Sequence, residues 1–467
     1  NETNGTVTVN RGDSTGTATI TLGQGNDTYT STSTGVDTVT ATAGNNTIST
    51  GEGADIVTLG TGGDNVTAGK GNDTINVETA NFDSDHTVAG GEGTDTVTIS
   101  DAGTHVDADF TNFSSVETIS YGNNATVLTL GAQSAAAGLK TVTDGTGNTT
   151  LTIGSGHTNA TTVALSTGND SITATNMTAN LTVTAAVASI DANDTLTGGT
   201  GSDTLSITHD GTTLTAAELA NVSGFETMKV ATDATTGAIT LADANIAAGE
   251  SLTVDATKQT TTNFVFSAAN ETNGTVTVNR GDSTGTAIIT LGQGNDTYTS
   301  TSSGVDTVTA TAGANTISTG AGDDVINSGA GADTITAGLG ANVVNLDTAA
   351  LLGSSSAMDT ITDYTAATYI VHIDESEVDG DWILLDDSAS GTGATAVFHT
   401  ITTATDLGGI TANTSVLRLN LTGNLADTDA VETALEVTGE LALTVGGNTA
   451  VDDTFFVLYD DGADSYF

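Results

Sequence analysis

Residues 43–77 read AGNNTISTGEGADIVTLGTGGDNVTAGKGNDTINV. An acidic or amide residue recurs through this stretch at every ninth position, in a series that begins just upstream of it. Most members of the series follow a Gly-x-Gly-x turn, and each is followed two places later by an aliphatic residue. The series is Asp37, Asn46, Asp55, Asp64 and Asp73, and the aliphatic residues are Val39, Ile48, Val57, Val66 and Ile75.

A nine-residue period is too short for a globular domain and does not match a heptad. It fits one edge of a parallel solenoid coil, with a turn of about six residues and a strand of about three. Glycine allows the positive φ angles of a tight turn. Aspartate supplies a hard oxygen ligand that suits calcium, and turn carbonyls can complete the shell. A flexible Gly/Asp-rich linker is the alternative, but it does not explain the regular aliphatic residues.

This pattern resembles the nonapeptide of the repeat-in-toxin (RTX) family, whose form G-G-x-G-x-D-x-U-x binds Ca²⁺ in a parallel β-roll. In that family two nonapeptides make one coil. The resemblance implies that Asp37, Asp55 and Asp73 line one edge of the roll, and that Asn46 and Asp64 line the other. We therefore expect an all-β protein, a parallel β-roll or β-solenoid with calcium-binding repeats and a small β-rich cap at its C-terminal end.

The predicted cofactor is Ca²⁺, bound at several sites. Single motifs outside the regular series, such as Gly198-Gly199-Thr200-Gly201-Ser202-Asp203, extend the set. The predicted metal ligands are Asp27, Asp37, Asn46, Asp55, Asp64, Asp73, Asp95, Asp170, Asp203, Asp296, Asp306, Asp324, Asp333 and Asn342. The glycines predicted to form the turns of these sites are Gly51, Gly53, Gly60, Gly62, Gly69, Gly71, Gly91, Gly93, Gly199, Gly201, Gly292, Gly294, Gly320, Gly322, Gly329 and Gly331.

The composition limits the possible partners. The chain has 467 residues, with 7 Lys and Arg against 57 Asp and Glu, and a formal charge of −50. Such a polyanion does not bind nucleic acid through phosphate contacts. Divalent metal at the periodic aspartates would offset the self-repulsion. A halophile's acidic surface would explain the charge but not the nine-residue phase. There is no cysteine, so metal and stacking must replace disulfides, and no apolar run is long enough for a transmembrane helix.

A long internal repeat organises the chain. Residues 1–50 and 270–319 align at an offset of 269 with 47 of 50 identical, which indicates duplication of a module. The differences are Thr19/Ile288, Thr34/Ser303 and Asn45/Ala314. At the same offset Asn342 replaces Asp73, which predicts weaker calcium binding there. The expected domains are a first roll at 1–80, an irregular β-solenoid at 81–269, a second roll at 270–347 and a capping and secretion region at 348–467.

The irregular and C-terminal regions carry weaker signals. Short alternating strands continue through residues 151–266, with a β-sandwich as the rival interpretation, and a helical turn is expected at 216–222. A repeated corner at Val116-Glu117-Thr118 and Phe225-Glu226-Thr227 resembles segments of bacterial surface-layer and large RTX surface proteins. A helix is expected at 428–437. The tail, VDDTFFVLYDDGADSYF, resembles the C-terminal region of RTX proteins exported by type I secretion, with an ordinary edge hairpin as the alternative.

The sequence predicts no enzyme active site. The six histidines form no His-x-x-x-His pair, and no Gly-x-Ser-x-Gly elbow lies between a strand and a helix. Arg11-Gly12-Asp13 and Arg280-Gly281-Asp282 spell a tripeptide that some integrins recognise, but we favour a polar turn copied by the duplication.

The expected function is that of an extracellular, calcium-binding structural protein. The chain would be a self-assembling subunit of a bacterial surface layer or filament, with calcium triggering folding and assembly at the surface of a Gram-negative-type cell. Its partners would be further copies of itself and outer-membrane surface polysaccharide. One alternative is a calcium-stabilised spacer or adhesin segment of a larger RTX protein, and a second is a non-catalytic fragment of an RTX enzyme or toxin.

Overall fold

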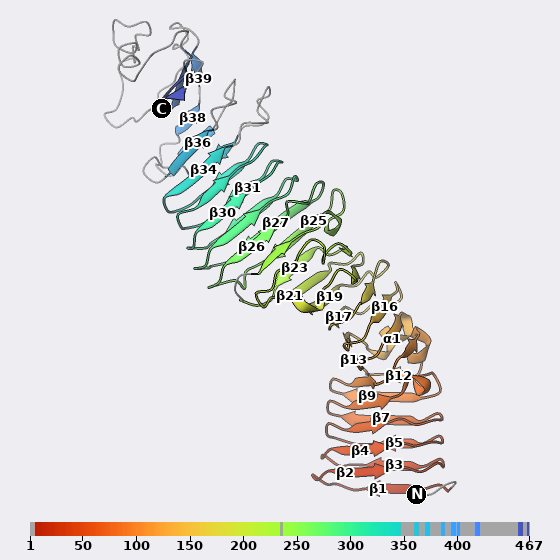
Figure 1. Ribbon diagram of the computed structural model, residues 1–467. Coiled ribbons are helices and arrows are strands. Elements are labelled where there is room, and N and C mark those ends of the chain that lie inside the picture. Colours follow the sequence, from red (N-terminus) through yellow and green to blue (C-terminus); the bar gives the residue numbers. More distant parts are fainter. Residues whose placement is uncertain are drawn as a thin grey trace, which may run out of the picture. The chain divides into compact units, whose positions relative to one another are not determined.

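The computed structural model describes residues 5–233, 237–346 and 359–363, together with the backbone of the strands that follow between 369 and 466. The chain divides into two compact units, Asn1–Asp255 and Ala256–Phe467. In both units short parallel strands stack into sheets, with each coil of the chain laid on the one before it (Figure 1). The expected parallel β-solenoid is therefore confirmed.

One long parallel sheet runs through the first unit. Its strands pair in register, as in Thr38 with Ile56 and Ile56 with Thr74, so each coil adds one strand. The strands are β2 (Ala18–Thr21), β4 (Asp37–Thr40), β6 (Ile56–Thr58), β8 (Thr74–Val77), β10 (Thr96–Ile99), β13 (Thr118–Tyr121), β15 (Thr141–Thr143), β17 (Thr161–Ala164), β19 (Leu181–Ala186), β21 (Thr204–Thr208), β23 (Thr227–Val230) and β25 (Ser251–Asp255).

Two further sheets of the first unit follow one another along the coils. The first contains β1 (Thr8–Arg11), β3 (Thr28–Ser31), β5 (Thr47–Ser49), β7 (Asn65–Lys70), β9 (Thr87–Glu92) and β12 (Phe113–Ser114). The second contains β11 (Gly103–His105), β14 (Thr126–Leu130), β16 (Thr149–Ile153), β18 (Ser171–Thr173), β20 (Thr195–Thr197) and β22 (Val222–Ser223). Strand β24 (Ala238–Thr240) follows, with Ile239 bridging to Leu214.

The second unit repeats the arrangement. One sheet contains β27 (Thr275–Arg280), β29 (Thr297–Ser300), β31 (Thr316–Ser318), β33 (Thr334–Thr336), β35 (Thr360–Ile361), β37 (Leu384–Asp387) and β38 (Ala394–Val397). The other contains β26 (Phe264–Ser267), β28 (Ala287–Thr290), β30 (Asp306–Thr309), β32 (Val325–Asn327), β34 (Asn342–Leu346) and β36 (Tyr369–Ile373). Strands β39 (His399–Ile401), β40 (Val416–Asn420), β41 (Phe456–Asp460) and β42 (Ser465–Tyr466) form a separate sheet.

The core is thin because each strand contributes only a few inward side chains, one or two in most strands and three in strands such as β16 and β19. The aliphatic residue two places after each member of the nine-residue series points inward: Val39, Val57 and Ile75 are fully buried. The residues on either side of these three, most of them threonines, point outward and are partly exposed, as the two-residue alternation of a strand requires. The nine-residue pattern therefore fixed which face of each strand is buried.

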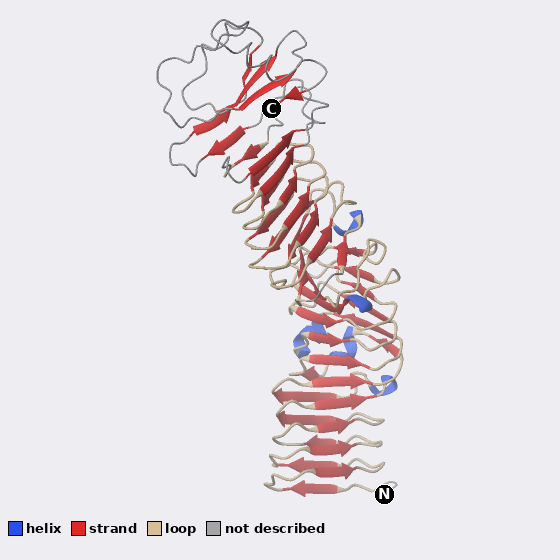
Figure 2. Cartoon of the chain, turned by 60° about the vertical axis from the view of Figure 1, so that its left-hand side comes forward, coloured by secondary structure: helices blue, strands red, loops and turns tan. Residues whose placement is uncertain are grey.

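Among the described residues, helical structure is confined to short corners of the coils (Figure 2). The helix α1 (Ala132–Ala137) was not expected from the sequence; it begins where the Asp107 carboxylate accepts hydrogen bonds from the amides of Gly131 and Ser134. It ends at Gly138, whose φ of 104° reverses the chain. The 3₁₀ turns are η1 (Thr79–Asn81), η2 (Asp107–Phe110), η3 (Val187–Ser189) and η4 (Asp243–Asn245).

The predicted helical turn at 216–222 is present as a series of hydrogen-bonded turns, the first of which has the i to i−4 bond of an α-helical turn. The amides of Leu219 and Val222 donate to Thr215 and Leu219, and Val222 then enters strand β22. Two other expected features lie outside the described residues: the helix at 428–437 and most of the predicted capping and secretion region.

Candidate calcium sites

A ladder of carboxylates runs along one edge of the first roll. The Asp37 amide donates to Oδ1 of Asp55 at 2.7 Å, and the Asp55 amide donates to Oδ1 of Asp73 at 2.7 Å. The ladder continues from the Asp73 amide to Oδ1 of Asp95 at 2.8 Å, and from the Asp95 amide to Oε2 of Glu117 at 2.9 Å. Each acidic side chain thus accepts a hydrogen bond from the backbone of the coil before it, and Asp37, Asp55 and Asp73 lie on one edge, as the two-repeat coil implied.

The other edge of the same roll carries a second ladder. The Asp27 amide donates to Oδ1 of Asn46 at 2.9 Å, and the Asn46 amide donates to Oδ1 of Asp64 at 3.0 Å. The Asp64 amide donates to Nδ1 of His86 at 3.1 Å. The ladder therefore alternates an acid with an amide and ends on an imidazole that the nine-residue series did not predict.

The second roll has the same two ladders. On one edge the Asp306 amide donates to Asp324 at 2.7 Å, and the Asp324 amide donates to Asn342 at 3.0 Å. On the other edge the chain of bonds runs from Val276 to Asp296, Asn315, Asp333 and Asp359, with distances of 2.7, 2.9, 2.7 and 2.8 Å.

The isolated motifs of the irregular region join ladders as well. The Thr149 amide donates to Asp170 at 2.7 Å, and the Asp170 amide donates to Asp194 at 2.8 Å. The Leu181 amide donates to Asp203 at 2.6 Å. These aspartates therefore occupy the same structural position as those of the rolls.

The second carboxylate oxygen of most ladder aspartates is buried without a hydrogen-bond donor. Each aspartate with such an oxygen is 1% exposed or less. A buried carboxylate oxygen without a donor or a cation is costly, so these positions fit a bound cation. The aspartates with such an oxygen are Asp55, Asp64, Asp73, Asp95, Asp170, Asp296, Asp324 and Asp333.

The asparagines of the ladders show what surrounds that second atom. The Asn46 Nδ2 donates to the carbonyl of Gly44 at 3.2 Å, and the Asn315 Nδ2 donates to the carbonyl of Gly313 at 3.0 Å. The Asn342 Nδ2 likewise donates to the carbonyl of Gly338 at 3.3 Å. In the equivalent aspartates an oxygen replaces this nitrogen, and a hard cation can join a carboxylate to turn carbonyls of this kind.

Burial raises the pKa of several ladder carboxyls. The pKa of Asp55 and Asp73 rises to about 6, and that of Asp324 and Asp333 also rises to about 6. Burial raises the pKa of Asp170 to about 7. The charged form of these groups is disfavoured in the absence of a cation, which is the condition under which metal and protons compete for one oxygen.

Glycines let successive turns stack directly on one another. Gly53, Gly71 and Gly93 have φ angles of 133°, 131° and 140°. A Cβ on Gly71 would lie 1.7 Å from the carbonyl oxygen of Gly53. Five other predicted turn glycines do not have left-handed φ angles: Gly60, Gly199, Gly201, Gly292 and Gly294. At these positions the absence of a side chain only allows neighbouring atoms to approach the backbone closely.

No described part of the chain gathers three or more acidic or histidine side chains around one point. A cation between two turns would therefore take one or two carboxylate oxygens and complete its shell with backbone carbonyls. Calcium tolerates such mixed, irregular oxygen shells. This arrangement can bind hard cations and link adjacent coils through them.

Four predicted ligands already have partners for both carboxylate oxygens. Asp27 accepts from the amides of Val7 and Gly23, and Asp203 accepts from those of Leu181 and Gly199. At the other two, Asp37 and Asp306, the partners are an arginine and a tyrosine. The arginines belong to the two Arg-Gly-Asp tripeptides, and burial of Arg280 (2% exposed) leaves it unavailable to a receptor.

The fold and the ladders together define a calcium-type β-roll, and comparison with known families agrees. The model of the RTX calcium-binding nonapeptide repeat (4 copies) matches residues 31–66, 59–78, 191–206, 300–335 and 309–344. The chain therefore carries RTX calcium-binding nonapeptide repeats, as its sequence pattern indicated. No curated protein matches it.

Several ladder members were not identified as candidate sites from the sequence. They are His86, Glu117, Asp194, Glu226 and Asp359. Each is followed by threonine and an apolar residue, as most members of the regular series are. That three-residue pattern identifies the ladder position even where the side chain is not aspartate and the preceding glycines are missing.

Proposed function

We propose that this chain is an extracellular calcium-binding structural protein that assembles with further copies of itself into a bacterial surface layer or surface filament. The observation that carries the proposal is the row of buried carboxylate oxygens without donors in a chain of charge −50. Cation binding would turn this electrostatic cost into folding free energy. RTX repeats are typical of secreted proteins, and no helix of the described residues is long and apolar enough to cross a membrane.

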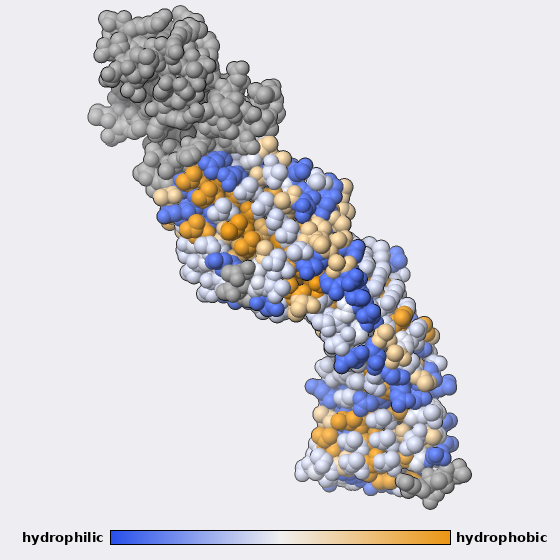
Figure 3. All heavy atoms as spheres, in the orientation of Figure 1, coloured by the Kyte–Doolittle hydropathy of each residue, from blue (hydrophilic) through white to orange (hydrophobic). Residues whose placement is uncertain are grey.

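An uncharged face of the second unit supports contact between copies. The outward positions of β26, β28, β30, β32 and β34 form one row in register, which we call the aliphatic row: Val265, Ile288, Thr307, Val325 and Val343. Ile288 is 51% exposed. Figure 3 shows apolar side chains gathered over these strands. Like-charged copies can approach most readily where neither presents a charge.

The structure gives no support to a catalytic role in its described part. Ser134 and His157 lie 3.0 Å apart, but both are fully buried, and the second imidazole nitrogen contacts Thr161 and not a carboxylate. The buried carboxylates cap backbone amides in regular ladders. We therefore propose a non-catalytic protein on the surface of a Gram-negative-type cell, with outer-membrane surface polysaccharide as a further partner.

Calcium titration followed by sedimentation velocity tests the proposal. Without calcium we expect a slow, expanded monomer, and with calcium we expect large species. A compact monomer at saturating calcium would favour the second candidate function, a spacer or adhesin segment. The duplication of the roll also favours that candidate. An unchanged sedimentation coefficient would contradict calcium loading altogether.

Ile288→Thr tests the aliphatic row. It introduces the residue that the first copy of the repeat has at Thr19, in a coil that is otherwise almost identical, so the fold is expected to tolerate it. We expect assembly to require a higher protein concentration, with unchanged calcium binding. Ser303→Thr, another position where the copies differ, is the control and should leave assembly as in the wild type.

A further inference from the structure

We infer that, at one position in each roll, the protein supplies its own cation in place of calcium: the guanidinium of Arg280 beside Asp306, and that of Arg11 beside Asp37. Sequence pattern alone assigns both aspartates as calcium ligands. The inference rests on the proposed calcium binding at the other ladder positions. It distinguishes coils in which an arginine neutralises the aspartate from coils that bind calcium.

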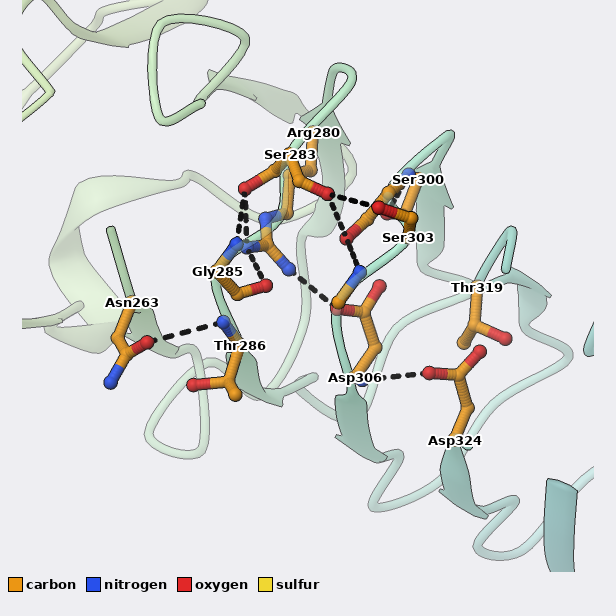
Figure 4. Close-up of polar contacts among 12 residues, drawn as sticks. Asn263, Arg280, Ser283, Gly285, Thr286, Ser300, Ser303, Asp306, Thr319 and Asp324 are labelled. Carbon is orange, nitrogen blue, oxygen red and sulfur yellow. Dashed lines mark hydrogen bonds and ion pairs between the residues drawn. The ribbon is translucent and has the colours of Figure 1, made fainter. Parts of the chain in front are cut away.

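Arg280 lies at the end of β27, beside Asp306 (Figure 4). Both side chains are completely buried. Its Nη1 donates to Oδ1 of Asp306 at 2.5 Å. Its Nη2 donates to the Ser283 hydroxyl at 2.8 Å and to the Gly285 carbonyl at 2.7 Å. The guanidinium thus contacts a carboxylate, a hydroxyl and a turn carbonyl, which is the type of oxygen shell that calcium would require.

The remaining oxygen of Asp306 is also occupied. The Tyr298 hydroxyl donates to Oδ2 at 2.9 Å, so both oxygens of this carboxylate have donors. In the next coil, Asp324 has one oxygen bonded to the Asp306 amide and the other buried without a donor. Two neighbouring members of one ladder therefore differ in whether a cation is already present.

A divalent ion has no place beside Asp306 while the arginine stays. The guanidinium is permanently charged, and its N–H donors occupy the position beside the carboxylate that a calcium ion would take. Two cations at such close range in a buried site repel strongly. The Asp306 position is therefore incompatible with calcium in this conformation.

The first copy repeats the arrangement with a less buried arginine, because the Arg11 side chain is 16% exposed. Arg11 forms an ion pair with Oδ1 of Asp37 and contacts Ser14 and the Gly16 carbonyl. The Tyr29 hydroxyl donates to Oδ2 of Asp37 at 2.8 Å. Because the copies share this cluster, each roll has a coil whose cation is covalently attached, and the calcium-dependent coils are stacked on it. The attached cation makes the order of that coil independent of the calcium concentration.

Calcium counting in paired variants of the full chain tests the assignment. We expect Asp306→Asn to bind as many calcium ions as the wild type and Asp324→Asn to bind at least one fewer, measured by equilibrium dialysis. Lys70→Gln, which removes an exposed cation paired with Glu52, is the control and should bind the wild-type number. Equal loss of calcium in Asp306→Asn and Asp324→Asn would overturn the assignment.

Hydrogen exchange on the wild-type chain gives a second test that needs no variant. In calcium-free buffer we expect peptides with Arg280, Ser283 and the β30 strand to exchange more slowly than peptides covering β31 to β33. Equally fast exchange in both sets would contradict an attached cation. A wild type that binds no calcium would overturn the proposed function as well, whereas calcium loss confined to Asp306→Asn would leave that function intact.

Discussion

The coils of the first roll and the longer coils that follow it are stabilised by different interactions. Ladder partners in the roll lie 18 to 20 residues apart, and those of the later coils lie 21 to 24 apart. The short coils bury single aliphatic side chains such as Val57 and Ile75. The longer coils add an aromatic cluster, in which Phe82 contacts Phe110 edge-on at 5.1 Å. Fewer residues per coil leave less apolar surface to bury, so the roll depends more on cations.

Removal of calcium should produce the largest difference between the two kinds of coil. With chelator, we expect amides of β5 to β8 and β31 to β33 to lose most of their protection from hydrogen exchange. Amides of β14 to β19 should keep most of theirs, because an apolar core holds those coils. Hydrogen exchange with mass spectrometry measures both, and equal loss everywhere would contradict the comparison.

Acidification of the calcium-free chain should partly reverse that loss. Burial raises the folded-state pKa of Asp55, Asp73 and Asp324 to about 6, above the unfolded value near 4. The folded state therefore holds more protons between these values, and its stability falls as pH rises through 6. We expect a more compact calcium-free chain at pH 5 than at pH 7.5 by sedimentation velocity. With calcium present, we expect the chain to be more compact at pH 7.5 than at pH 5, because protons compete with the metal for the carboxylates. A calcium-free chain that is more compact at pH 7.5 would contradict the raised pKa values of these carboxyls.

Phe110→Ala should weaken the longer coils without changing their response to calcium. Phe110 is 1% exposed and contacts both Phe82 and Phe113, so the free energy of unfolding should fall by about 3–5 kcal/mol. Urea unfolding at saturating calcium measures the loss. Val106→Ala, at a side chain 46% exposed, is the control, with a change of about 0.5 kcal/mol or less. A comparable loss in both variants would mean that the aromatic cluster is not a core.

Gly71→Ala should have a smaller effect, localised in the roll. Its φ of 131° and the close carbonyl of Gly53 leave no room for a methyl group, so a cost of about 1–3 kcal/mol is expected. Weaker calcium binding should accompany it, measured by titration calorimetry. Gly12→Ala, where nothing lies within 4 Å, is the matched control. Identical calcium affinity in the two variants would show that direct stacking of turns is not needed for the site.

The nine-residue series predicted the ladder positions well because the geometry of the coil requires that spacing. A residue that caps the amide of the coil before it must recur once per half-coil, and the strand alternation then places the aliphatic residue inward. The irregular corners obey no such rule. Helix α1, for example, depends on Asp107, a residue 24 positions before the Gly131 amide that it caps.

By itself, the sequence determined the parallel coil, the ladder positions of Asp55 and Asp73, and the identity of the RTX repeat, because period and alternation are local properties of the chain. Only the tertiary structure decided which ladder carboxylates lack a partner. Arg280 and Asp306 are 26 residues apart, and their pairing depends on the length of the coil that separates them. Whether a carboxylate needs an external cation is set by what the neighbouring coil brings to it, and no local pattern records that.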